Sequence, residues 1–399
     1  MLSLGLMQKS CPCISKIFCR IITMSIKKPK VLFFSTTSYA EPIPASINKK
    51  FEILGELATI KIFAYKARKS ESHVSSSILH LFKRPKNRFI RYIKTIYTTL
   101  FIMRKHFSRA DIVVVQDPIL ALLVLLSIRF VNKKPKLVIE SHGDFIETVT
   151  LERNLLFPNL YKFLLKIIAS YTLNRADCLR VISSSTRQQV ESFTQDKLIV
   201  EFPAWIDLKN FLDVDYKPEK STVLFLGSIS DRKNPLLILR SLNNLRKDTV
   251  FYLTIIGPHI NKEYLNMLDQ YIRNNDLDEF VTIKKEIDQA EVIDFLARSS
   301  LLILPSKSEG LGRVILEAQA VGCPVLVSDS GGMKDFIEDT KTGFIFKNND
   351  VIDLSEKIEL ILNDKQLMKD VSLYGKESLY KFYNSDSFIK GYKKIFEEV

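Results

Sequence analysis

Short apolar runs rich in β-branched residues recur along the chain and alternate with longer segments that have the periodicity of amphipathic helices. Apolar strands separated by helices predict parallel sheets with helices on both faces. Two series of such runs in 399 residues predict two α/β domains, because one core rarely grows to that size. The first series lies at 30–34, 58–65, 111–115, 136–140 and 178–182, and the second at 222–227, 251–257, 280–284, 301–305, 324–328 and 343–346.

The boundary between the predicted domains lies at 201–222, a segment with two prolines, many charges and little hydrophobic periodicity. Residues 1–25 resemble a poor signal peptide, since basic residues interrupt their apolar stretch, and Met24 directly precedes the first predicted strand. We therefore expect a dispensable or mis-annotated extension at 1–25, an N-terminal domain at 26–205 that is completed by a C-terminal helix at 384–399, and a C-terminal domain at 206–383.

Charge is distributed unevenly between the two halves of the chain. Residues 1–205 carry 32 Lys and Arg against 14 Asp and Glu, a net charge of +18, whereas residues 206–399 carry 26 against 31, a net charge of −5. We therefore expect the first half to meet an anionic partner. The five cysteines are too few and too scattered for a disulfide framework, which indicates a reducing, cytoplasmic compartment.

The positive charge is densest in a segment that contains no Asp or Glu, residues 72–110. Its aromatic and apolar residues alternate with basic ones, and such a pattern on a helix suits an anionic membrane surface. Nucleic acid is the rival anion, but nothing else in the chain resembles a nucleic-acid module, so we favour a peripheral membrane contact through 83–109. An apolar stripe packed on the core, with a solvated basic face, explains the pattern equally well. The nine basic residues are Lys83, Arg84, Lys86, Arg88, Arg91, Lys94, Arg104, Lys105 and Arg109.

Polar residues follow the predicted strands where a binding site is expected. Ligands of open α/β sheets bind beyond the carboxyl ends of the strands, so two such domains place the natural site in a central cleft between them. Glycines let a ligand approach main-chain N–H groups, and a helix N-terminus favours an anionic or polar ligand. The loop after the strand at 301–305 has this character, since it contains Glu309, Gly310, Leu311 and Gly312.

A second carboxylate, Glu317, lies among apolar residues of the helix that follows this loop. Burying a carboxylate is costly unless its lone pairs are satisfied. Glu317 therefore either accepts hydrogen bonds from two neighbouring hydroxyls of a ligand, as on a ribose, or pairs with Arg313 one turn earlier.

Two other loops are expected to face the same cleft. Gly227 ends a predicted strand, and Arg232 and Lys233 stand just before a helix that Pro235 opens, which makes either a diphosphate clamp or a solvated surface pair. His142 follows the strand at 136–140, where it can donate to a sugar hydroxyl or to a developing charge, or can be merely structural.

The segment "EGLGRVILEA", in which seven residues separate Glu309 from Glu317, resembles the Glu-x7-Glu signature of the group 1, family four retaining glycosyltransferases. The neighbouring "PSKSEG" and "AVGCPVLVSDSGG" are similar to the same family, and the resemblance extends over most of 30–385. It implies the GT-B fold, in which two doubly wound Rossmann-like domains face a central cleft.

The resemblance also implies roles for individual residues. Glu309 would contact the donor sugar beside the N–H groups of Gly310 to Gly312, and Glu317 would hold the nucleotide ribose. Lys233 would bind the diphosphate, and His142 would lie near the transferred sugar. The donor would be a nucleotide-diphosphate sugar, the transfer would retain the anomeric configuration, and no metal or other cofactor would be required.

The chain departs from the family at two loops. Ser228 stands where the family usually has Arg, and we expect Arg232 to compensate. The loop at 35–50 lacks the usual glycine pair, so the resemblance leaves the acceptor open; a glycan or lipid-linked acceptor in bacterial surface polysaccharide biosynthesis, such as lipopolysaccharide, would fit. The alternatives are a sugar-nucleotide epimerase of the same fold and a membrane-docked scaffold without turnover. The "DVD" at 213–215 resembles a metal-binding motif of another class, but we expect it to be solvent-exposed.

Overall fold

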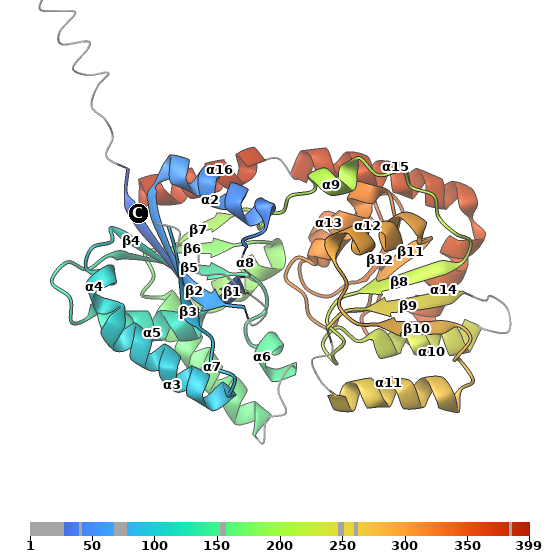
Figure 1. Ribbon diagram of the computed structural model, residues 1–399, viewed down its shortest axis with the longest axis horizontal. Helices are drawn as coiled ribbons and strands as arrows, with labels where there is room; N and C mark the ends of the chain where they lie inside the picture. Colours follow the sequence, from blue (N-terminus) through green and yellow to red (C-terminus); the bar gives the residue numbers. More distant parts are fainter. Residues whose placement is uncertain are drawn as a thin grey trace, which may run out of the picture.

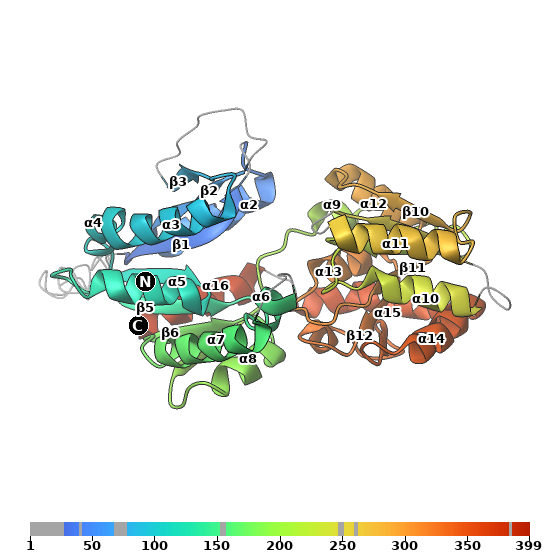
Figure 2. The same ribbon diagram turned by 90° about the horizontal axis from the view of Figure 1, so that it is seen from below.

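The computed structural model describes two α/β domains, each built on a single parallel sheet with helices on both faces (Figures 1 and 2). This confirms the predicted fold class. The extension expected at 1–25 lies outside the described residues, which are 28–39, 42–67, 78–151, 157–245, 251–258, 262–382 and 385–399.

The N-terminal domain contains a seven-stranded sheet in the order β3-β2-β1-β4-β5-β6-β7. Every neighbouring pair of its strands is parallel, and the order reverses between β1 and β4. The strands are β1 (Lys30–Tyr39), β2 (Thr59–Lys66), β3 (Leu79–Lys83), β4 (Ile112–Gln116), β5 (Lys136–Ser141), β6 (Cys178–Val181) and β7 (Leu198–Glu201).

Local sequence signals explain where several helices of this domain begin. The Asp117 side chain accepts a hydrogen bond from the backbone of Leu120, and Pro118 occupies the first turn of the helix. Ser183 and Thr186 form a capping box at the start of another helix. The helical elements are α2 (Ala45–Leu57), α3 (Arg88–Tyr97), the π-helical η1 (Thr98–Ile102), α4 (Arg104–Phe107), α5 (Pro118–Ile128), α6 (Glu147–Leu151), α7 (Pro158–Leu173) and α8 (Ser184–Glu191).

The basic segment 83–109, whose pattern was considered on a helix, is not helical throughout. Its start belongs to the edge strand β3, which ends at Lys83, pairs with β2 and buries Leu79 in the core. A loop at 84–87 then precedes α3. Phe107 is fully buried, whereas Phe89 is 70% exposed. The segment therefore divides into a part that packs on the core and a part that faces solvent.

The C-terminal domain contains a six-stranded parallel sheet in the order β10-β9-β8-β11-β12-β13. Its strands are β8 (Thr222–Leu226), β9 (Tyr252–Ile256), β10 (Val281–Lys284), β11 (Leu301–Leu304), β12 (Val325–Ser328) and β13 (Phe344–Phe346). Because the order reverses between β8 and β11, the loops that leave these two strands lie next to each other. The helical elements are α9 (Lys209–Leu212), α10 (Pro235–Leu245), α11 (Lys262–Asn274), α12 (Gln289–Arg298), α13 (Arg313–Val321), η2 (Met333–Phe336), α14 (Val351–Asn363) and α15 (Lys365–Phe382).

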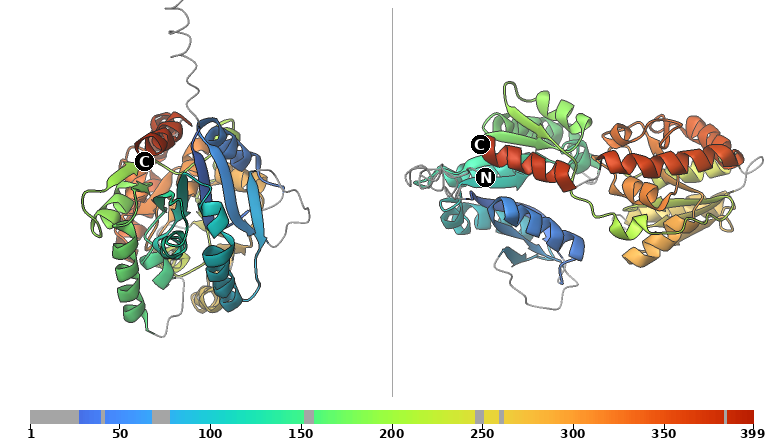
Figure 3. Two further views of the ribbon diagram at one scale, coloured as in Figure 1. Left: turned by 90° about the vertical axis from the view of Figure 1, so that its left-hand side faces the viewer. Right: turned by 90° about the horizontal axis from the view of Figure 1, so that it is seen from above.

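The last helix, α16 (Ser385–Glu398), returns to the N-terminal domain, where it packs against α2 and β7 (Figure 3). Its buried residues Phe388, Tyr392 and Ile395 join the core on the face of the first sheet that α2 also covers. The ring of Phe388 lies 5.3 Å from that of Trp205, in the segment that connects the two domains. The chain therefore crosses between the domains twice.

Candidate active site

Two adjacent loops of the C-terminal domain, at 227–234 after β8 and at 305–312 after β11, are joined by several hydrogen bonds. The backbone N–H of Lys307 donates to the carbonyl of Arg232 at 2.8 Å, and the guanidinium of Arg232 donates to the carbonyl of Ser308 at 2.9 Å. An ion pair of 2.7 Å between Lys307 and Asp231 closes the same contact. These bonds fix the loops as one unit at the point where the strand order reverses.

The unit brings together Glu309, Lys233 and Arg232. The Lys233 ammonium donates to Oε2 of Glu309, and Nη1 of Arg232 lies 3.4 Å from the same oxygen. The three side chains are only 15%, 12% and 13% exposed, respectively. Burial by itself would raise the pKa of Glu309, but the two cations outweigh it and lower that pKa. Two cations against one ionised carboxylate leave a surplus positive charge, which suits a phosphate group.

Glycines allow this unit to touch the N-terminal domain. A Cβ on Gly310 would overlap the carbonyl oxygen of His142, and one on Gly332 would overlap Gly310 and the side chain of Ser183. Gly312, at the start of α13, has a φ of 66°, a left-handed conformation that glycine adopts without strain. The loops after β5, β11 and β12 therefore meet at close range, and we call this meeting point the domain junction.

A polar contact also crosses the domain junction. The Asp335 carboxylate, on η2 of the C-terminal domain, accepts hydrogen bonds from the backbone N–H and the hydroxyl of Ser184, each at 2.7 Å. Ser184 begins α8 of the N-terminal domain, where free N–H groups favour a carboxylate. Asp335 thereby ties the two domains together beside the glycine contacts.

His142 reaches the domain junction from the end of β5. Its Nε2 lies 2.9 Å from Oε2 of the buried Glu140, and its side chain is 34% exposed. Burial lowers the pKa of His142 by more than Glu140 raises it, so the ring is neutral at pH 7. A neutral imidazole that is partly open to solvent is suited to hydrogen bonding with an uncharged hydroxyl.

The other predicted residues lie in the same loop units or on the following helix. Glu317, on α13, has a raised pKa because it is buried, and its Oε1 lies 3.5 Å from Nη2 of the exposed Arg313. The pairing alternative is thus present, and a role with a ligand stays a prediction. Leu311 packs its side chain into the core, so only its backbone is available to a ligand. Gly227 lies against the methylene groups of Lys233.

Sequence reasoning missed three residues that shape the domain junction: Gly257, Asp335 and Glu140. A Cβ on Gly257 would overlap the carbonyl of Gly227, so the glycine that ends the "FYLTIIG" run lets the loop after β8 fold down. That glycine is a signal in the sequence. Asp335 and Glu140 gain their importance from partners in the other domain or in a distant element, which no local pattern reveals.

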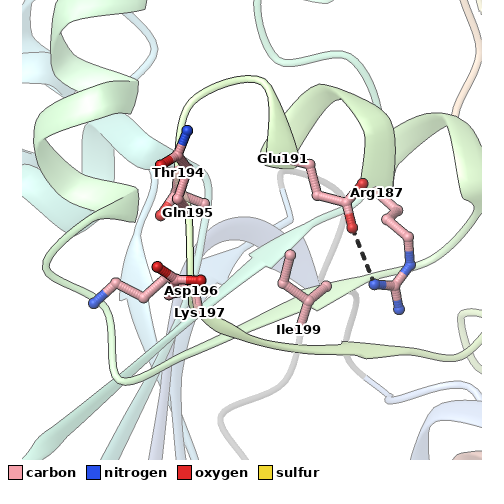
Figure 4. Close-up of a pocket in the computed structure, with 7 residues that line it drawn as sticks. All are labelled: Arg187, Glu191, Thr194, Gln195, Asp196, Lys197 and Ile199. Atoms are coloured by element: carbon pink, nitrogen blue, oxygen red, sulfur yellow. Dashed lines mark hydrogen bonds and ion pairs between the residues drawn. The ribbon is translucent and has the colours of Figure 1, made fainter.

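Three other places where a ligand could bind lie apart from the domain junction or lack the residues for a metal site. Within the part of the chain that the structure describes, no three His, Cys, Asp or Glu side chains gather as a metal site. Asp213 and Asp215 of the "DVD" sequence are solvent-exposed. A pocket beside α8 lies just before β7, at the amino end of that strand, whereas the domain junction lies beyond the carboxyl ends of the strands. Its Arg187 and Glu191 pair with each other (Figure 4).

Comparisons with known proteins agree with this architecture. The family model "Glycosyl transferases group 1" matches residues 210–378, and the model "Glycosyltransferase Family 4" matches residues 59–210. An uncharacterised glycosyltransferase of Methanocaldococcus jannaschii is 27% identical over 57% of this chain and 62% of its own length. The human alpha-1,3/1,6-mannosyltransferase is 23% identical over 74% of this chain and 75% of its own length. The chain therefore spans about three fifths of the first relative and three quarters of the second.

Solved structures share the fold at low identity. Sucrose-phosphate synthase from Thermosynechococcus elongatus superposes with a TM-score of 0.75 at 15% identity, over 93% of this chain and 99% of that one. The Anabaena protein HepE, solved in complex with UDP and glucose, gives a TM-score of 0.71 at 14% identity, over 93% and 100%. Since a group 1 model covers most of the C-terminal domain and a family 4 model covers most of the N-terminal domain, the chain belongs to the group 1 glycosyltransferases. The solved structures show that it has the GT-B fold.

Proposed function

We propose that the protein is a retaining glycosyltransferase that moves a sugar from a nucleotide-diphosphate donor to a glycan or lipid-linked acceptor. The observation that carries the proposal is the partly buried cluster of Glu309, Lys233 and Arg232 at the domain junction. Its surplus positive charge complements a diphosphate, and its carboxylate can accept from sugar hydroxyls. The solved complexes of HepE with UDP-glucose support a donor of this class.

The chemical step follows from the charge that develops on the leaving group. As the bond from the anomeric carbon to the phosphate oxygen breaks, Lys233 and Arg232 stabilise the departing diphosphate. The acceptor oxygen bonds to the anomeric carbon from the same face, and its proton passes to the departing phosphate, so the configuration is retained. Glu309 holds the sugar, and His142 forms a hydrogen bond with a sugar hydroxyl. This route needs neither a covalent nucleophile nor a metal ion.

We also propose that the acceptor is part of a bacterial surface polysaccharide. A Campylobacter jejuni transferase whose name specifies an undecaprenol-linked acceptor is 26% identical over 60% of this chain. The lipopolysaccharide outer core galactosyltransferase WaaB shares the fold with a TM-score of 0.65 at 16% identity. Acceptors of this kind are carried by lipids, so we place the protein on the inner face of the plasma membrane.

The surface of the N-terminal domain supports that placement. The helices α3, α5 and α7 run side by side across one face of the first sheet (Figure 2). Their solvent side is apolar, and the segment 157–175 that contains α7 includes Lys162 and Lys166 but no acidic residue. We call this surface the apolar–basic face; its exposed apolar residues include Phe89, Ile90, Ile93, Ile96, Tyr97, Phe101, Phe130, Phe157, Leu160, Phe163, Leu164 and Ile167.

An anionic bilayer fits the apolar–basic face better than water does. Exposed aromatic and aliphatic side chains insert at the boundary of the acyl chains, and nearby Lys and Arg attract anionic headgroups. Among the described residues, no helix is both long and apolar enough to cross a bilayer. The proposed contact is made by the sides of several helices that lie along the membrane, because their exposed apolar residues form this face.

Donor binding is predicted to depend on Lys233 in a specific way. Thermal shift with UDP, GDP and ADP first identifies the preferred nucleoside diphosphate. Lys233→Ala should weaken its binding by roughly 10- to 100-fold, because a charge-assisted contact is lost. Glu309→Gln should leave this affinity equal or higher, since it frees Lys233 from its ion pair. Lys220→Ala is the control, because Lys220 is exposed in the segment before β8, at the other end of that strand. Equal weakening by Lys233→Ala and Lys220→Ala would contradict the assignment.

Sugar transfer is predicted to require Glu309. Glu309→Ala should lower kcat/KM by about 100-fold or more while the melting temperature stays close to that of the wild type. Glu279→Ala is the matched control, since Glu279 is exposed just before β10, at the amino ends of the strands and away from the site. NMR of the product should show the anomeric configuration of the donor. Unchanged transfer by Glu309→Ala would remove the site, and conversion of the donor sugar without any acceptor would favour an epimerase.

Membrane binding is predicted to need the apolar–basic face. The double variant Phe163→Asp/Ile167→Asp should lower the bound fraction on phosphatidylglycerol vesicles by roughly tenfold, because it places charges in the apolar contact. Leu373→Asp is the control, since Leu373 is an exposed apolar residue of the C-terminal domain. Binding should also fall with added salt and be weaker on phosphatidylcholine. The proposal would be contradicted if the wild-type protein bound neither kind of vesicle, or if it formed dimers through this face.

A further inference from the structure

A buried charged cluster lies directly behind His142. Glu140, at the end of β5, is surrounded by Arg180 of β6 and Tyr392 of α16, and all three side chains are almost completely inaccessible to solvent. Three elements that are distant in sequence therefore meet at one carboxylate. The proposed chemistry assigns no role to any of these three residues.

Each oxygen of the Glu140 carboxylate is occupied. Oε1 accepts the hydroxyl of Tyr392 and lies 3.2 Å from Nη1 of Arg180, while Oε2 lies 2.9 Å from Nε2 of His142. Arg180 is held in turn by a 3.2 Å hydrogen bond to the carbonyl of Pro203 and by the ring of Phe202, 4.2 Å away. Both oxygens of the carboxylate therefore have partners, and these partners fix the orientation of the carboxylate toward His142.

This geometry fixes the tautomer of His142. Burial would raise the pKa of Glu140, but Arg180, His142 and Lys50 hold it well below its usual range, so the carboxylate is ionised and only accepts. The neutral ring of His142 must then carry its proton on Nε2, and this N–H donates a hydrogen bond to Oε2 of Glu140. Nδ1 is left as an acceptor, which can take a hydrogen bond from a sugar hydroxyl.

We propose that the C-terminal helix α16 positions His142 through this cluster, so that Tyr392, Glu140 and Arg180 are positioning residues for the transfer reaction. The proposal rests on the proposed function, because it assigns the cluster to the same site. Tyr392, which lies 252 residues from Glu140 in the sequence, thus becomes part of the site at the domain junction.

Anchoring of α16 does not by itself explain the cluster. Phe388 and Ile395 already pack α16 into the core, and the ring of Phe388 contacts Phe202 and Trp205. A buried ion pair is often no more stabilising than apolar residues of the same size. The Tyr392 hydroxyl therefore adds orientation at Glu140 beyond what packing requires. The groups that interact electrostatically with Glu140 come from five elements or their adjoining loops: Tyr39, Lys50, His142, Arg180 and Tyr392.

The test removes one hydroxyl and leaves the ring. Tyr392→Phe should lower kcat about three- to tenfold with a donor KM within twofold of the wild type, because His142 loses its fixed orientation but the donor contacts remain. It should also raise the pKa of His142, since Glu140 shares less of its charge with Tyr392. The pKa is measured by NMR titration, with His142→Gln identifying the signal among the five histidines.

Tyr65→Phe is the matched control, because Tyr65 is a buried tyrosine of the same domain whose hydroxyl bonds Thr95 at 2.6 Å. This control should leave kcat and the His142 titration unchanged. If Tyr392→Phe matches Tyr65→Phe in both readouts, the positioning role is overturned. The titration needs no catalysis, so a wild-type protein without transfer activity would refute the proposed function while the shift at His142 still decides the positioning role.

Discussion

The ion pair between Lys233 and Glu309 is the interaction on which the candidate site depends. It exists because the strand order reverses between β8 and β11, so that the loops of two strands distant in sequence lie side by side. The two side chains neutralise each other. Under the proposed function, a diphosphate sugar offers both of them a better partner, since the phosphate attracts the ammonium while the sugar hydroxyls donate to the carboxylate.

A second buried carboxylate organises the opposite side of the domain junction. Glu140 in the N-terminal domain and Glu309 in the C-terminal domain each sit among cations that keep them ionised. The first faces a histidine, and the proposed function assigns the second to the donor sugar. Backbone contacts at Gly310 and the pairing of Asp335 with Ser184 bring these two centres together. Each domain thus contributes an acceptor of fixed orientation to the domain junction.

Much of the fold could be predicted from the sequence, because apolar strands and helix caps are local signals. The strands β3 and β7 were missed, since β3 is short and lies in a segment whose basic residues indicated a helix. Glu309, Lys233 and His142 were expected at the junction from their places after strands, and the family resemblance gave them roles. The pairing of Lys233 with Glu309 and the bond from Tyr392 to Glu140 depend on tertiary structure, which spacing does not encode.

The decisive measurement for the site is a crystal structure of the protein with an intact, non-hydrolysable form of its preferred donor. We expect the diphosphate to lie within hydrogen-bonding distance of Lys233 and Arg232, with a sugar hydroxyl on Glu309 and the ring of His142 facing the sugar. A donor bound elsewhere, or a Lys233–Glu309 pair left intact beside a bound donor, would contradict it.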